Sequence, residues 1–83
     1  MNSYKTAGVC SKQVSFDIVD NKISSVNFVG GCNGNLKGIS SLIEGMEVNE
    51  AIKRLKGITC GNRDTSCPDQ LSRALEEYVA SSI

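Results

Sequence analysis

The chain has 83 residues and a formal net charge of zero, because nine basic residues balance nine acidic ones. That balance, with two tyrosines, two phenylalanines and no tryptophan, argues against a protein that binds nucleic acid or a membrane surface. A chain of this length predicts one domain, residues 1–83, whose small core commonly depends on a disulfide, a metal or a second chain.

The first third of the sequence predicts an antiparallel sheet. Residues 4–9 are a weak candidate strand, and residues 14–18 alternate between apolar and polar side chains, as a half-buried strand does. Asp20 and Asn21 favour a tight turn, and residues 23–29 are rich in β-branched side chains. We therefore expect a three-stranded antiparallel meander.

The rest of the sequence predicts three helices. Apolar residues at positions 36, 39, 42, 43 and 46 predict a helix that ends at Gly45, and those at 48, 51, 52 and 55 predict a second one that ends before Gly57. Ser66 is a good N-cap for the third helix, with Asp69 as its capping-box partner. The predicted fold class is α+β, with the three helices packed on one face of the meander.

Four cysteines and the absence of histidine are the main chemical signal. The start of the chain has no apolar run typical of a secretory signal, so we expect a cytoplasmic protein, in which structural disulfides are uncommon. Cys10 and Cys32 follow strands that end at the same sheet edge, Cys60 lies between the second and third helices, and Cys67 begins the third helix. We expect these four thiols to gather and to bind zinc or an iron–sulfur cluster.

Other functions are left open by the spacing. No two cysteines are separated by two residues, so the usual zinc-finger pair is absent, and Cys60 with Cys67 could instead form a redox pair. A glycine-rich segment before the first helix is either a tight turn or a cradle for the phosphate of a nucleotide or flavin. Its candidate ligand-binding residues are Gly30, Gly31, Asn33, Gly34 and Asn35. No catalytic residue is expected, because the chain has no histidine and no recognisable carboxylate pair.

The run Thr65-Ser66-Cys67-Pro68-Asp69 resembles the motif that names the TSCPD domain family, and segments 30–36 and 55–62 are similar to its stand-alone small members. This domain also occurs at the C-terminus of adenosylcobalamin-dependent ribonucleotide reductases. The resemblance therefore implies a metal, most simply zinc, bound by four cysteines. It also implies a ribonucleoside-diphosphate reductase or another redox enzyme as partner. A chain of 83 residues has no room for the reductase barrel, so an accessory role in DNA synthesis is expected, and a homodimer is left open.

The order of strands, cysteines and first helix also resembles NifU-type iron–sulfur scaffolds, which implies a NifU- or SufE-like arrangement. In that comparison Cys10, Cys32 and Cys67 match the three cysteines of the scaffold, and Cys60 is an additional ligand. A closed site of four thiolates would retain a metal, because no coordination position is left for transfer.

Overall fold

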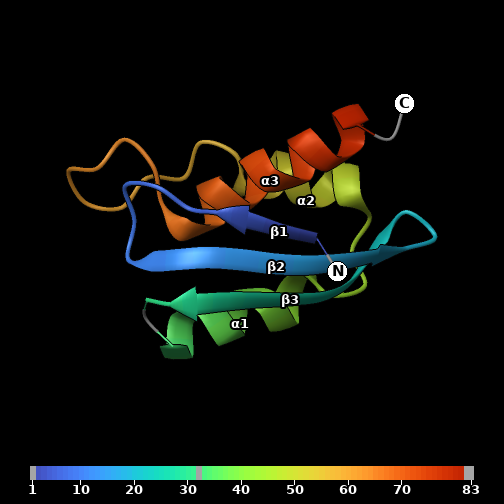
Figure 1. Cartoon of the computed structure of the whole chain (residues 1–83), viewed down its shortest axis with the longest axis horizontal. Helices are drawn as coiled ribbons and strands as arrows, with labels where there is room; N and C mark the ends of the chain where they lie inside the picture. Colours follow the sequence, from blue (N-terminus) through green and yellow to red (C-terminus); the bar gives the residue numbers. More distant parts are fainter. Residues whose placement is uncertain (1, 32, 82–83) are drawn as a thin grey trace.

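The structure is a computed structural model that describes residues 2–31 and 33–81. Three strands come first: β1 (Asn2–Lys5), β2 (Ser11–Val19) and β3 (Lys22–Gly30). Three helices follow: α1 (Asn33–Ile43), α2 (Val48–Leu55) and α3 (Cys67–Ser81). The strands form an antiparallel sheet in the order β1-β2-β3 (Figure 1). The predicted α+β class and the meander are confirmed.

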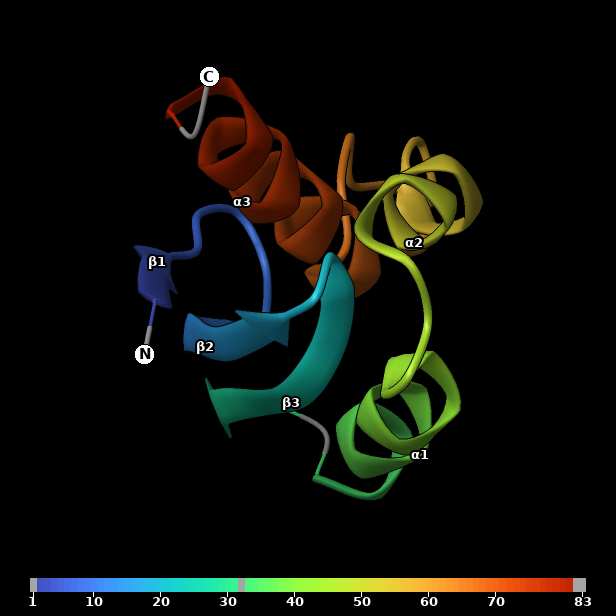
Figure 2. The same cartoon turned by 90° about the vertical axis from the view of Figure 1, so that its right-hand side faces the viewer.

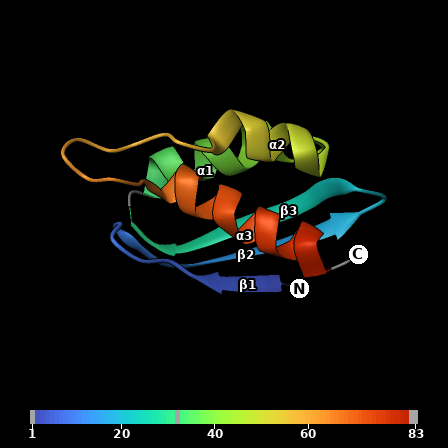
Figure 3. The same cartoon turned by 90° about the horizontal axis from the view of Figure 1, so that it is seen from above.

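The sheet and the helices form two layers. Opposite β2, the strand β3 places Val26 beside Phe16 and Phe28 beside Val14. These side chains lie on one face of the sheet, and all three helices cover that face (Figures 2 and 3). The buried apolar core between the layers consists of Val14, Phe16, Ile23, Val26, Ile43, Val48, Ala51, Leu55, Leu71, Ala74 and Leu75.

The hairpin between β2 and β3 has the predicted turn. Asp20 and Asn21 have φ angles of 53° and 65°, the left-handed conformation that a two-residue hairpin turn requires at both positions. The helices end close to the predicted glycines, since α1 ends at Ile43, two residues before Gly45, and α2 ends at Leu55, two residues before Gly57.

The first strand is shorter than predicted, because β1 ends at Lys5 and not at residue 9. Directly after Lys5, Thr6 forms two hydrogen bonds to the start of β2. Its N–H donates to the Lys12 carbonyl (3.2 Å) and its side-chain hydroxyl donates to the Ser11 carbonyl (2.5 Å). Residues 6–10 are therefore a loop, and Cys10 lies directly before β2 rather than at the end of a long first strand.

The start of α3 is capped as predicted, but Asp69 has a different role. The Ser66 hydroxyl accepts a hydrogen bond from the Asp69 N–H (3.2 Å). The Asp69 carboxylate accepts hydrogen bonds from the Gly57 N–H (2.8 Å) and the Thr65 hydroxyl, and it pairs with Arg73 (3.1 Å). Asp69 therefore joins the end of α2 to the first turn of α3, and its expected role as a capping-box partner was wrong.

These contacts decide the charge state of Asp69, which is 4% exposed. Burial acts to raise the pKa of Asp69, but the hydrogen bonds from Thr65 and Gly57 and the positive charge of Arg73 outweigh it, so the pKa is lowered. A carboxyl group whose pKa is lower in the folded state stabilises the protein above its unfolded pKa of about 3.9. That contribution is lost as the pH falls through the folded pKa.

We predict that Asp69→Ala lowers the free energy of unfolding by about 2 kcal/mol at neutral pH, because Gly57 and Thr65 lose a charged acceptor. Urea denaturation at a series of pH values measures this. The difference from the unmodified protein should shrink as the pH falls below the unfolded pKa of about 3.9 and through the lower folded pKa, as the carboxyl group is protonated. Asp64→Ala, in an exposed loop, is the control and should change stability little. Equal losses in the two variants would contradict the assignment.

Candidate functional site

Three of the four cysteines line one pocket of about 180 Å³. Cys10 comes from the β1–β2 loop, Cys60 from the α2–α3 loop and Cys67 from the first turn of α3. These two loops lie at the same end of the molecule (Figures 1 and 3). The other residues that line the pocket are Val9, Asn35, Leu36, Ile39, Arg63, Ser66 and Pro68. The structure thus brings together thiols that are up to 57 positions apart (67 − 10).

Cys32 lies outside the described residues, and its role as a ligand stays a prediction. The described residues before and after it belong to this end of the fold. A Cβ atom on Gly31 would lie 3.1 Å from the Ser11 backbone nitrogen, and Asn35 and Leu36 line the cysteine pocket.

The described thiols are free, and they differ in their surroundings. Cys10 and Cys60 are exposed, whereas Cys67 is half-buried. The Cys67 sulfur lies 3.1 Å from the Ser11 hydroxyl oxygen, and the Cys10 sulfur accepts a long hydrogen bond (3.9 Å) from Arg63 Nη1. Each of these two sulfurs therefore has a polar neighbour from another segment of the chain.

Local hydrogen bonds fix the segment between Cys60 and Cys67. The Cys60 N–H donates to the Thr65 carbonyl (3.3 Å), and the Arg63 N–H donates to the Cys60 carbonyl (3.0 Å). The Ser66 hydroxyl, which caps α3, also donates to the Ile58 carbonyl (2.6 Å). The loop is thereby closed on itself and attached to the first turn of α3, which holds both cysteines beside the pocket.

The β1–β2 loop is held against the same turn of α3. Gln70, which is 2% exposed, accepts a hydrogen bond from the Ala7 N–H (3.1 Å) and donates one to the Thr65 hydroxyl (3.0 Å). Arg63 Nη1 also donates to the Gly8 carbonyl (3.3 Å). Sequence reasoning did not identify Gln70 or Ser11. Gln70 could have been noticed in the sequence, because it is a polar residue one helical turn before Ala74, on the apolar side of α3.

The pocket has sulfur atoms that could bind a soft metal ion, but the described side chains are not close enough together to bind one. No carboxylate of the described residues lines it, and sulfur is the donor that zinc and iron–sulfur clusters prefer. In the part of the chain that the structure describes, no three cysteine, aspartate or glutamate side chains are grouped closely enough to hold a metal ion. The pocket, of about 180 Å³, has room for an ion, since one water molecule needs about 15 Å³. For the described thiols to bind the same ion, they would have to lie closer together than they do.

The glycine-rich segment is shorter than predicted. Gly30 is the last residue of β3, and α1 begins at Asn33, so Gly34 and Asn35 belong to a helix. Gly30 and Gly31 have φ angles of +79° and +83°, which supports the interpretation as a tight turn. The phosphate cradle that was the alternative for these residues stays a prediction.

The fold and the pocket define a small α+β domain with cysteines gathered at one end. The family model of the TSCPD domain matches residues 2–79, a range that contains all four cysteines. The chain belongs to the TSCPD domain family. No curated protein and no solved structure matches the chain, and the similarity to NifU-type scaffolds stays a prediction. Within residues 2–31 and 33–81, no helix has the length and apolar character needed to cross a bilayer.

We predict that Gly31→Ala destabilises the protein by about 2 kcal/mol or more, because the new Cβ atom would lie 2.9 Å from a Leu36 methyl group at a positive φ. Gly34→Ala is the matched control. No heavy atom of the described residues lies within 4 Å of its Cβ position, and alanine favours a helix over glycine by about 0.5–1 kcal/mol. Thermal and urea denaturation of both variants check this. Equal effects would contradict the tight approach at Gly31.

Proposed function

We propose that the protein is a small metal-binding module in which Cys10, Cys32, Cys60 and Cys67 bind one zinc ion, with an iron–sulfur cluster as the alternative. The observation that carries this proposal is that three of these thiols, from distant parts of the chain, line one pocket to which none of the described residues contributes a carboxylate. A fourth thiolate from Cys32 would complete a closed tetrahedral site.

The metal would act mainly on stability and shape. A centre held by these four residues would link the β1–β2 loop, the β3–α1 connection and the α2–α3 loop. Because such a site does not form in an unfolded chain, the free energy of metal binding adds to the free energy of folding. Four thiolates around a divalent ion carry a net negative charge, and Arg63, whose Nη1 lies 3.9 Å from the Cys10 sulfur, would offset part of it.

The proposed role and partner rest on two observations, the absence of an acid–base pair in the described pocket and the resemblance to the TSCPD family. The described pocket presents no general acid–base pair, so an accessory role is favoured over independent catalysis. The TSCPD resemblance makes a cytoplasmic ribonucleotide reductase, or another redox enzyme, the proposed partner. In that role the metal centre would keep the loop surface around the pocket in one shape for contact with the enzyme.

Thiol exchange is a second candidate function, favoured by the way the segment between Cys60 and Cys67 closes beside the pocket. In this reaction Cys60 and Cys67 lose two protons and two electrons and form a disulfide. A disulfide in the partner enzyme accepts both and becomes two thiols. Metal binding and thiol exchange exclude each other at these residues, because a coordinated thiolate is not free to attack.

We predict that protein purified without oxygen contains one tightly bound zinc ion per chain, and that Cys67→Ser loses it. Elemental analysis measures the metal, and a visible spectrum separates zinc, which is colourless, from an iron–sulfur cluster. Removal of the metal with a chelator should lower the thermal stability of the unmodified protein. A metal-free protein whose stability is unchanged by a chelator would contradict the proposal. A disulfide between Cys60 and Cys67 in that protein would support thiol exchange.

We also predict that Ser11→Ala weakens zinc binding about tenfold to a hundredfold, because Cys67 would lose the hydroxyl group beside its sulfur. Competition with a chromogenic chelator measures the affinity. Ser24→Ala, in the β2–β3 hairpin, removes another serine hydroxyl and should leave zinc affinity unchanged. Equal affinity in both variants would show that Ser11 does not position Cys67.

A further inference from the structure

A second pocket, of about 210 Å³, lies between β1 and α3 and is called the β1–α3 pocket below. α3 lies over β1 on the covered face of the sheet (Figure 2). The helix contributes positions 74, 77, 78 and 81, a spacing that places them on one side of α3. No described residue lines both this pocket and the cysteine pocket, so the two sites are separate.

Three of the four aromatic residues of the chain line the β1–α3 pocket: Tyr4 from β1, Phe16 from β2 and Tyr78 from α3. The ring centroids of Phe16 and Tyr78 are 6.1 Å apart, and the two ring planes are inclined at 79° to each other. Tyr4 pairs with Val14 and is therefore a diagonal neighbour of Phe16, within reach of an aromatic side chain on the same face. Phe16 is buried, whereas both tyrosines are half-buried. The pocket is thus bounded by rings that meet at an angle.

One carboxylate lines the same pocket, and no lysine or arginine of the described residues does. The carboxylate belongs to Glu77, which is exposed and forms no ion pair within the described residues. The preceding residue differs, because Glu76 pairs with Lys56 (2.9 Å). The β1–α3 pocket therefore has a negative charge that no described side chain neutralises.

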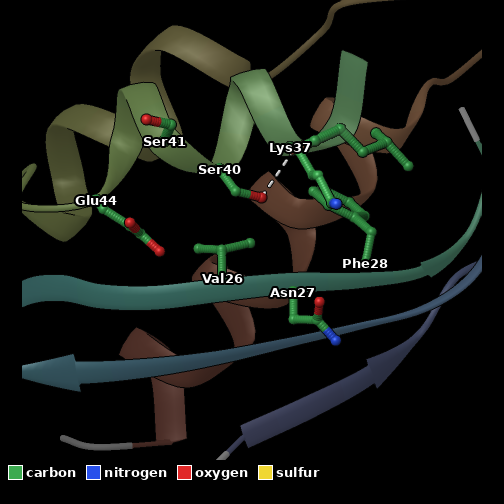
Figure 4. A pocket seen from close by; sticks show the side chains of 8 residues that line it. Val26, Asn27, Phe28, Lys37, Ser40, Ser41 and Glu44 are labelled. Carbon is green, nitrogen blue, oxygen red and sulfur yellow. Dashed lines mark hydrogen bonds between the residues drawn. The ribbon is translucent and has the colours of Figure 1, made fainter. Parts of the chain in front are cut away.

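Two other pockets at the covered side of the sheet each have a positive charge. Arg63 lines the cysteine pocket. Figure 4 shows Lys37 and Glu44 in a groove of about 160 Å³ between β3 and α1, in which Phe28 is the one aromatic side chain among the described lining residues. Of these three sites, the β1–α3 pocket is the one that combines several aromatic rings with an uncompensated carboxylate, and this combination suits a cation.

We propose that the β1–α3 pocket binds a quaternary ammonium group. Glu77 supplies the opposite charge, and the three aromatic rings supply the walls. A cation over an aromatic ring is attracted by the negative face of the ring. A quaternary ammonium group also has no N–H donor that would lose a water partner on burial, and its methyl groups bury apolar surface against the rings. This site lies beyond the proposed metal-binding function and involves no cysteine.

Titration with choline, followed by NMR of the backbone amides, tests the proposal. Choline should shift the amide signals of β1 and of residues 74–81 in a saturable way. Dimethylbutanol, the neutral isostere with carbon in place of the charged nitrogen, should bind about tenfold more weakly or less. Absence of saturable choline binding, or equal binding of the two compounds, would overturn the proposal.

Side-chain variants assign the binding to this pocket. Glu77→Gln, at an exposed position that should not affect folding, should weaken choline binding about threefold or more, because the cation loses its opposite charge. Tyr78→Leu should weaken it about fivefold or more, because one ring is lost. Glu76→Gln is the matched control and should leave choline binding unchanged. Equal choline affinity in Glu77→Gln and Glu76→Gln would contradict the assignment. None of these measurements depends on which metal the cysteines bind.

Discussion

The contact between the β1–β2 loop and the first turn of α3 is the constraint on which the cysteine pocket depends. Gln70 holds the Ala7 N–H (3.1 Å), Ser11 lies against Cys67 (3.1 Å), and Arg63 reaches the Gly8 carbonyl (3.3 Å). These contacts join parts of the chain that are 55 or more positions apart, and they set where Cys10 lies relative to Cys60 and Cys67. Without them the thiols would sit on independent loops.

The middle of the domain and its cysteine end are stabilised in different ways. The middle is apolar, whereas the cysteine end has buried polar side chains, among them Thr6, Ser11, Ser66, Asp69 and Gln70. Each of these takes part in a hydrogen bond, and no buried side-chain polar atom in the described residues lacks a partner. A satisfied polar network fixes a unique arrangement but adds modest net free energy. A metal centre at that end would supply stability that the network alone does not.

Much of the fold could be predicted from the sequence because its signals are local. Alternation in β2, the turn at Asp20 and Asn21, and the cap at Ser66 each depend on neighbouring residues. The site was harder to predict, because its contacts are long-range. The early end of β1 follows from the Thr6 hydrogen bonds. The Asp69 carboxylate accepts from Gly57, twelve residues away, as well as from the Thr65 side chain. The gathering of the cysteines was inferred from topology. The contacts of Arg63 with Cys10 and of Ser11 with Cys67 were not inferred from the sequence.

X-ray absorption at the metal edge tests the gathering of the cysteines around one ion most directly. For zinc-loaded protein the expected first shell contains only sulfur, at about 2.3 Å, and Cys10→Ser should replace one sulfur with a lighter atom. Sulfur from Cys10 in that shell would mean that the β1–β2 loop reaches the same ion as the start of α3. A shell dominated by oxygen or nitrogen, or a sulfur count unchanged in Cys10→Ser, would contradict a shared centre.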